Sequence, residues 1–419
     1  MFGLPLMSTS PASSPTPSHG RAATSSTLAD ATPWASMTAL MLATFVAAAN
    51  ETVPAGLLPQ LADGFNISES WAGQMVTLCA LGAGVGAVPL TVLMRRWSRR
   101  TVLLVALLGF AVCNAVTAVS TDFTLTLAAR FVVGLATGLA WSEIATYARR
   151  LVSPSRQGRA LAFAMLGVPL ALAIGVPAAT ALGHLIGWRW VFGALAAVAL
   201  ILVGWMRLIV PDVPGTNDTG SGSGARASMI DVLRLPGVRP VLAVVMLWVI
   251  AHYTLYTYIA PFLASAGMGD RLAAVLSTFG ICTLVGLWGV GLWVDRWLRR
   301  LVLLALAGFT IVIVVFGTWP TSWPVLVAGA VLWGLSFSGA PTILQTALGN
   351  AAGKHENVAQ SMLVTVFNLS FAGSGILGGA VLSTWGAAAL PHVLVVLALA
   401  ALGVAFAARR HGFVQRIQA

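Results

Sequence analysis

Residues 91–100 read TVLMRRWSRR, and residues 291–300 read GLWVDRWLRR. The two stretches stand 200 positions apart, and both end in Arg-Trp-x-Arg-Arg after a long apolar segment. One basic cluster after an apolar segment is typical of an anchor that sets membrane orientation. An anchor does not explain a second copy at a matched distance. The repeat therefore indicates that the chain is built from two equivalent halves.

The composition is that of an integral membrane protein. Hydrophobic residues make up 58% of the chain and charged residues 8%, whereas a soluble domain carries about 25% charged residues. The net charge of +11 comes from arginines clustered in short loops, so we expect no nucleic-acid partner. The three cysteines lie singly in apolar segments, and we expect no disulfide, metal site or cofactor.

Twelve apolar segments are long enough to cross about 30 Å of hydrocarbon as helices. We place them near 37–60, 71–94, 101–119, 123–147, 158–184, 188–210, 238–263, 270–294, 300–319, 323–348, 356–383 and 387–408. The expected fold class is all-α, with two bundles of six transmembrane helices. Such parallel repeats are related by an axis along the membrane normal, and a cavity forms where they meet.

The polar segments divide the chain into five predicted parts. We expect a disordered tail at 1–35, a first bundle at 36–210, a linker at 211–236, a second bundle at 237–408 and a tail at 409–419. With the N-terminus inside, 20 of the 23 basic residues lie in inside segments and two in outside segments. The positive-inside rule thus predicts that both termini are cytoplasmic.

The two basic loops resemble a motif of the major facilitator superfamily, Gly-x-x-x-Asp-Arg-x-Gly-Arg-Arg. The second copy matches it at Gly291, Asp295, Arg296, Arg299 and Arg300, and Leu298 replaces the motif's last Gly. The first copy keeps Arg96, Arg99 and Arg100 but has Thr91 and Arg95 in place of the Gly and Asp. In the superfamily this loop locks the cytoplasmic side. The resemblance therefore implies a cytoplasmic gate that depends more on Asp295 than on the first copy.

Further stretches resemble the sugar-efflux and arabinose-efflux permease branch of the twelve-helix drug/proton antiporters. They are residues 50–59, the stretch ARFVVG at 129–134, and HYTLYTYIAPFL at 252–263. Gly175, Pro177 and Gly183 in the fifth segment resemble a weaker form of the superfamily's antiporter signature. The alternative for these three residues is a bent helix that packs closely.

Three charged residues inside apolar segments are candidates for proton coupling, because charges in a bilayer are costly. Glu51 and Arg130 lie at similar depth, which predicts an ion pair that protonation of Glu51 would break; the alternative is a static pair. Glu143 is either a further proton site or an interfacial residue paired with Arg149 and Arg150. A fourth candidate, His252, is either a proton carrier or a hydrogen-bonded core residue.

Polar and aromatic residues in other segments are candidates for lining a substrate cavity. Three of the four tyrosines lie in one segment, 238–263, which favours a surface with hydroxyls and aromatic rings. Singly, such polar groups are more often contacts between helices. The predicted cavity set is Asn50, Tyr253, Tyr256, Thr257, Trp333, Gln345 and Asn368.

The function that these patterns favour is a proton-coupled exporter of a small molecule, such as a sugar or a drug, in the cytoplasmic membrane. No phosphate-binding loop is present, so an ion gradient must supply the energy. The expected partners are the substrate, protons and the lipid bilayer, and we expect a monomer. A proton-coupled nutrient importer is the alternative. A membrane-embedded transferase is remote, because the few His and acidic residues are dispersed.

Overall fold

The computed structural model describes residues 34–153, 156–214 and 229–413. Within these ranges the regular elements are helices, and twelve helical segments are long and apolar enough to cross a membrane. The predicted number of spans is confirmed. Most of the predicted N-terminal tail, the middle of the predicted linker and the end of the C-terminal tail lie outside the described residues.

The first six spans contain ten α-helices. They are α1 (Trp34–Gly56), α2 (Leu58–Phe65), α3 (Glu69–Ala72), α4 (Gln74–Leu93), α5 (Arg99–Val119), α6 (Phe123–Arg150), α7 (Gln157–Met165), α8 (Gly167–Leu170), α9 (Val176–Ile186) and α10 (Trp188–Ile209). A π-helical turn, Ala171–Gly175, joins α8 to α9.

The last six spans begin after a short helix, α11 (Met229–Arg234). They comprise α12 (Val238–Thr257), α13 (Ile259–Ser265), α14 (Leu272–Thr318), α15 (Trp323–Phe337), α16 (Ala340–Ala352), α17 (Glu356–Trp385) and α18 (Leu390–Ala407). Helix α14 carries two spans, and Trp297 interrupts it with φ −128° and ψ 30°. The sequence predicts a loop between these spans, whereas the structure has a kink.

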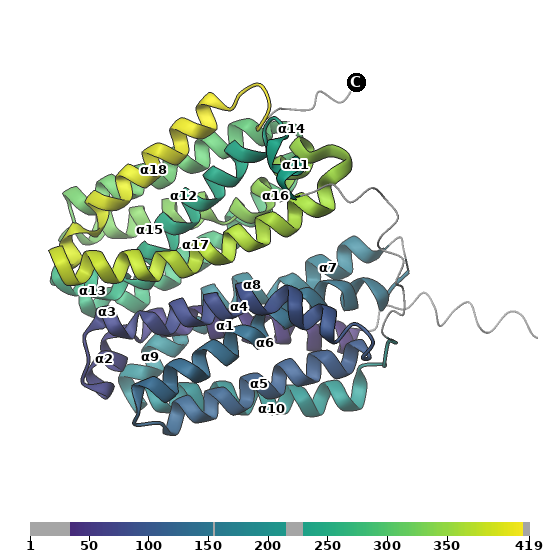
Figure 1. Cartoon of the computed structure of the whole chain (residues 1–419). Coiled ribbons are helices and arrows are strands. Elements are labelled where there is room, and N and C mark those ends of the chain that lie inside the picture. Colours follow the sequence, from purple (N-terminus) through teal and green to yellow (C-terminus); the bar gives the residue numbers. More distant parts are fainter. Residues whose placement is uncertain (1–33, 154–155, 215–228, 414–419) are drawn as a thin grey trace, which may run out of the picture.

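The two sets of helices form two packed bodies. In Figure 1, α1 to α10 (purple to teal) lie below α11 to α18 (green to yellow). The bodies approach each other at the end that carries α3 and α13, and their ribbons diverge toward the end that carries α7 and α16. One apolar core belongs to the first body alone, and a larger one extends from the second body into the first.

Prolines interrupt the spans whose segments resemble the antiporter branch. The break between α1 and α2 falls at Leu57, two residues before Pro59, and the break between α12 and α13 falls at Tyr258, three residues before Pro261. Proline lacks an N–H and clashes with the preceding turn, so the helix breaks there. The two breaks stand 201 positions apart, in agreement with the repeat.

Glycines set the close packing of α4 on α6. A Cβ atom at Gly134 would collide with the carbonyl oxygen of Cys79, and one at Gly138 would lie 3.1 Å from the Ala87 nitrogen. Gly82 faces the Phe131 carbonyl from the other helix. Small residues let transmembrane backbones approach in this way. The contact brings Arg130 and Glu143 of α6 against the rest of the first body.

Candidate substrate and coupling site

Glu51 lies in α1 and is half-buried. Its Oε1 accepts a hydrogen bond from Trp141 Nε1 in α6 at 3.2 Å. No ion pair to Glu51 occurs in the described part of the chain. A carboxyl group held only by a neutral donor inside an apolar bundle can exist in either protonation state, so it is suited to take up and release a proton.

Arg130 lies wholly buried in α6 and does not pair with Glu51. Its Nη2 donates to Asn114 Oδ1 at 2.6 Å, and its guanidinium carbon lies 4.9 Å from the Phe192 ring centre. Asn114 Nδ2 in turn donates to Asn50 Oδ1 at 2.8 Å. The predicted direct ion pair is therefore wrong. Asn114 links Arg130 to the residue that precedes Glu51 in the chain.

One side chain lies near both charged groups. Cys79 of α4 lies close enough to both Glu51 and Arg130 to interact electrostatically with each of them. The Nε and Nη1 atoms of Arg130 have no hydrogen-bond partner among the described residues. Arg130 is thus a buried cation whose own hydrogen bonds are incomplete, and Cys79 is the side chain that lies near both charged groups.

Glu143 belongs to a different cluster. Arg99 Nη1 donates to both of its carboxylate oxygens, at 2.7 and 2.8 Å, and the two side chains are 9% and 2% exposed. The interfacial pairing predicted with Arg149 and Arg150 is wrong, because Glu143 takes its partner from the first basic loop. A buried carboxylate held by a guanidinium at this distance is already neutralised, which makes it a poor proton carrier.

His252 lies in an aromatic cage in the second body. Trp333 Nε1 donates to His252 Nδ1 at 3.0 Å, and the Phe337 ring stacks on the imidazole at 3.2 Å between centroids. The side chain is 2% exposed. The geometry favours the second reading of His252, a hydrogen-bonded core residue. It is the acceptor that a buried tryptophan needs.

Part of the predicted cavity set lies at the junction of the two bodies. Tyr253 is half-buried and lies near Glu51, and its ring stacks on Phe371 at 3.8 Å. Tyr256 lies beside Thr52 of α1, although its hydroxyl lacks a partner of hydrogen-bond geometry among the described residues. The tyrosines of α12 therefore face α1 across the junction between the two bodies.

Of the remaining members of that set, Asn368 also lies at the junction, where a Cβ atom at Gly84 of α4 would be 3.0 Å from its Cβ atom. Thr257, Trp333 and Asn50 are buried in their own bodies. The side chain of Asn368 donates to the Val364 carbonyl of its own helix, and the backbone of Gln345 accepts from Gln360. In this conformation Tyr253, Tyr256 and Asn368 are the members of the predicted set that lie against the first body.

The Gly/Pro segment of the fifth span packs against the first. A Cβ atom at Gly175 would lie 2.9 Å from the Phe45 ring, and one at Gly183 would meet Leu57 and Gln60. Pro177 lies in the first turn of α9, directly after the π-helical turn. The alternative given for these residues, a bent and closely packed helix, is what the structure contains.

The two bodies bond to each other at the arginine-poor end. Ser70 Oγ donates to the Gly379 carbonyl at 2.8 Å, and Gln74 Nε2 donates to the Gly375 carbonyl at 3.4 Å. A side chain at Gly375 would collide with Thr77 Oγ1. Outside this seal lies a cavity of about 420 Å³, which Glu69 and Ser70 of the first body and Pro261 and Ser383 of the second help to line.

Comparison with known proteins agrees with this architecture. Residues 40–290 match the family model described as Major Facilitator Superfamily. The chain belongs to the major facilitator superfamily. It is 32% identical over 356 residues to chloramphenicol efflux pumps of two Mycobacterium tuberculosis strains, CDC 1551 / Oshkosh and ATCC 25618 / H37Rv. The match covers 82% of this chain and 84% of each relative.

Two solved transporters have the same fold. The nucleoside transporter NupG superposes with a TM-score of 0.73 at 13% identity, over 89% of this chain and all of that one. A D-xylose–proton symporter superposes with a TM-score of 0.72 at 17% identity, over 89% and 97% of the two chains. This superfamily member is thus a multi-pass cell-membrane transporter and not an enzyme.

The two copies of the superfamily's loop motif bond to different segments of the chain. In the first copy Arg100 pairs with Asp212 at 3.5 Å and donates to the Val210 carbonyl at 3.3 Å. Beside it, Tyr147 donates to the Pro211 carbonyl at 2.5 Å, and the Arg99 backbone N–H donates to the Val213 carbonyl at 2.9 Å. The first copy therefore fastens residues 210–213 to its own body.

The second copy is fastened to α18. Arg299 donates to the Ala405 and Phe406 carbonyls at 3.3 and 3.0 Å. Gly291, Arg296 and Arg300 are exposed, as is Arg96 of the first copy. The side chain of Asp295 lies outside the described residues, so the gate that depends on it stays a prediction.

Proposed function

We propose that this chain exports a small amphiphilic molecule across the cytoplasmic membrane by alternating access, in exchange for protons. The observation that carries the proposal is the 32% identity, over most of both chains, to chloramphenicol efflux pumps. A drug-like amphiphile with an aromatic ring is accordingly the proposed substrate class. The orientation follows the arginine count, with both termini in the cytoplasm.

The proposed cycle uses the two ends of the junction. The seal between Ser70 and Gly379 closes the periplasmic side, while the bodies diverge toward the cytoplasmic side, from which substrate enters. Tyr253 and Trp141 supply aromatic faces next to the one intramembrane carboxyl group without a cationic partner among the described residues. Closing the cytoplasmic side and breaking the seal would release substrate outward.

Proton exchange is proposed to occur at Glu51. In the deprotonated state its carboxylate accepts from Trp141, and the preceding residue Asn50 is linked to Arg130 through Asn114. Protonation removes the negative charge beside Trp141, and a resulting shift of α1 would reach Arg130 through Asn50 and Asn114, because Asn114 holds the Arg130 guanidinium. The coupling element is therefore a relay through Asn50 and Asn114, in place of a contact pair.

Everted membrane vesicles test this function. Acidifying the vesicle lumen should drive accumulation of labelled chloramphenicol in vesicles that contain the protein, and a protonophore should abolish it. Vesicles without the protein are the control. Accumulation driven instead by external acid in right-side-out vesicles would indicate the importer. A lack of movement of chloramphenicol and of a sugar panel in either vesicle type would contradict the proposed substrate classes.

A further inference from the structure

A lipid-facing groove lies between the second part of α14 and α18. Its volume is about 510 Å³, and the seven residues that line it are all apolar. Leu304 from α14 and Phe406 from α18 are 70% and 66% exposed along it. An acyl chain matches such a surface, because it offers apolar contact and no hydrogen-bonding group.

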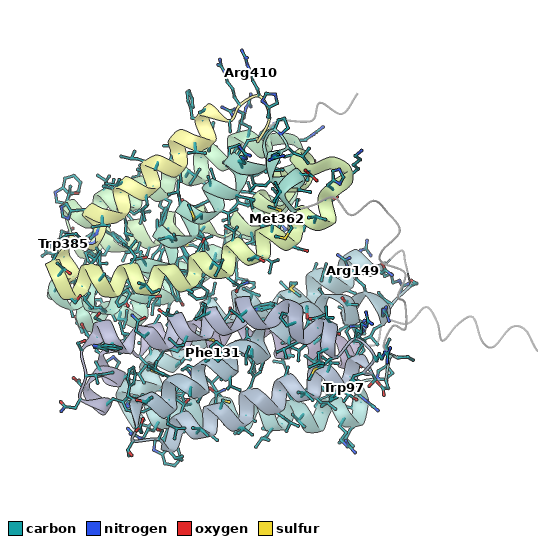
Figure 2. All side chains as sticks on the ribbon, viewed as in Figure 1. Trp97, Phe131, Arg149, Met362, Trp385 and Arg410 are labelled. Carbon is teal, nitrogen blue, oxygen red and sulfur yellow. The ribbon has the colours of Figure 1, made fainter. Side chains whose placement is uncertain are left out.

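Three arginines stand at one end of this groove. Arg300 lies one helical turn before Leu304, and Arg409 and Arg410 follow Phe406 by three and four residues. All three are exposed, and Figure 2 shows Arg410 at the outermost end of the second body. Within the described chain they have no hydrogen bond or ion pair, and Arg300 only approaches the Trp297 ring, at 5.9 Å. Positive charge is thus left unneutralised beside an apolar surface.

The repeat provides an internal comparison for this charge. Arg100 is the counterpart of Arg300, 200 positions earlier, and it is neutralised by Asp212 and two carbonyl groups. Arg300 has no such acidic partner among the described residues of the second half. Trp293 stacks on Trp297 at 6.0 Å between centroids, and tryptophan is enriched at the level of lipid headgroups. The arginines therefore lie where a lipid phosphate lies.

We propose that the groove between α14 and α18 is a binding site for an anionic phospholipid. One acyl chain lies against Leu304, Leu399 and Phe406, and the headgroup phosphate lies between Arg300 and Arg410. Basic pockets between transmembrane helices on the cytoplasmic side bind anionic headgroups in this way. The site is separate from the junction that carries transport and does not depend on the transported substrate.

Gly403 offers a way to fill the groove without disturbing its walls. It lines the groove, and a Cβ atom built there meets no other atom within 4 Å. Gly403→Leu should therefore occupy the space for the acyl chain and leave the helix packing intact. The charge at the mouth is removed separately, in the pair Arg300→Gln and Arg410→Gln. Arg149→Gln is the matched control, because Arg149 is an exposed arginine at the same end of the first body.

The experiment measures lipid binding to the purified full-length protein by native mass spectrometry. Phosphatidylglycerol is titrated against phosphatidylcholine with the same chains, and inorganic phosphate is added in a third series. The unmodified protein should retain phosphatidylglycerol preferentially. The double arginine variant should weaken its apparent affinity about 25-fold, at about fivefold for each arginine near the surface. Gly403→Leu should weaken it at least tenfold, while Arg149→Gln leaves it unchanged.

Three results would overturn the site. An equal loss in Arg149→Gln would mean a general surface charge effect. Unaltered binding in Gly403→Leu would place the lipid elsewhere. Competition by inorganic phosphate at the concentrations where phosphatidylglycerol binds would mean that the acyl chain is not recognised. If the arginine pair does not elute as a single species on gel filtration, Gly403→Leu and the phosphate series still decide the question.

Discussion

Glu51→Gln isolates the charge at the proposed coupling residue. The glutamine carbonyl oxygen can still accept the Trp141 Nε1 hydrogen bond, which is 3.2 Å long in the unmodified protein. The local packing should therefore survive, and only the titratable group is lost. The other acid in the interior of a described span, Glu143, is neutralised by Arg99. With Glu51 as its coupling residue, the proposed cycle moves one proton for each substrate molecule.

This stoichiometry sets the size of the expected effect. One pH unit is worth about 1.4 kcal/mol for each proton moved, so it sustains about a tenfold substrate gradient. In proteoliposomes with a gradient of one pH unit and no membrane potential, the unmodified protein should accumulate labelled substrate about tenfold. Glu51→Gln should equilibrate it to a ratio of about one and still exchange labelled for unlabelled substrate.

Trp141→Phe is the control for the hydrogen bond. It keeps the carboxyl group and removes its donor, so it should slow transport without removing the dependence on the pH gradient. A tenfold gradient maintained by Glu51→Gln would refute the reasoning and would require a different proton carrier. Loss of exchange as well as accumulation would show that the substitution damaged substrate binding.

The other expected outcomes concern stability and closure. Glu143→Gln should lower the free energy of unfolding by about 3–5 kcal/mol, because it leaves the Arg99 guanidinium buried without its counter-charge; thermal unfolding in detergent measures this, and an unchanged midpoint would contradict it. His252→Phe should cost about 1–3 kcal/mol by leaving a tryptophan N–H without an acceptor, and a shifted pH profile of transport would restore His252 as a proton carrier. Gly375→Val should strongly reduce transport by pushing the sealed end apart, whereas Gly373→Val, where a Cβ meets no atom within 4 Å, should not; equal activities would exclude the seal from the cycle.

The fold could be predicted from the sequence because lipid leaves the backbone few alternatives. Long apolar segments must be helices, and twelve of them were expected and are present. The breaks within spans were not predicted, although Pro59 and Pro261 carry the signal for them. The loop predicted before Arg300 is a kinked continuation of α14 at Trp297, since nothing at 295–299 forces the helix to end.

The error at the site has a clear physical origin. A rise of 1.5 Å per residue predicts similar depths for Glu51 and Arg130, yet Glu51 bonds to Trp141, which stands 11 residues after Arg130 in α6. Depth does not say which way a side chain points around its helix. Asn114 of α5 stands between Arg130 and α1, and it is a polar residue in an apolar span. That isolated polarity was the available signal. Trp141 gave no signal in the sequence, because a tryptophan in a membrane helix is common.

The pairing of Glu143 was mistaken for a related reason. Its neighbours in the sequence, Arg149 and Arg150, seemed to be its partners, but a residue six positions away lies more than one helical turn distant. The ion pair instead joins α6 to the start of α5, through Arg99. Two oppositely charged residues at the same membrane surface on different helices were both visible in the sequence. Which of several arginines would be chosen depended on how α5 packs against α6.

The two basic loops differ in the acids that their arginines contact. The first copy has Arg95 where the second has Asp295, so it contains no acid of its own. Its arginines obtain acids from elsewhere in the first body, Glu143 for Arg99 and Asp212 for Arg100. These bonds tie the loop to its own half and leave it less free to lock against the other. The second copy keeps its acid and leaves Arg300 without an ion pair among the described residues. The predicted gate and the proposed lipid site therefore both lie on the second copy, the one that retains Asp295.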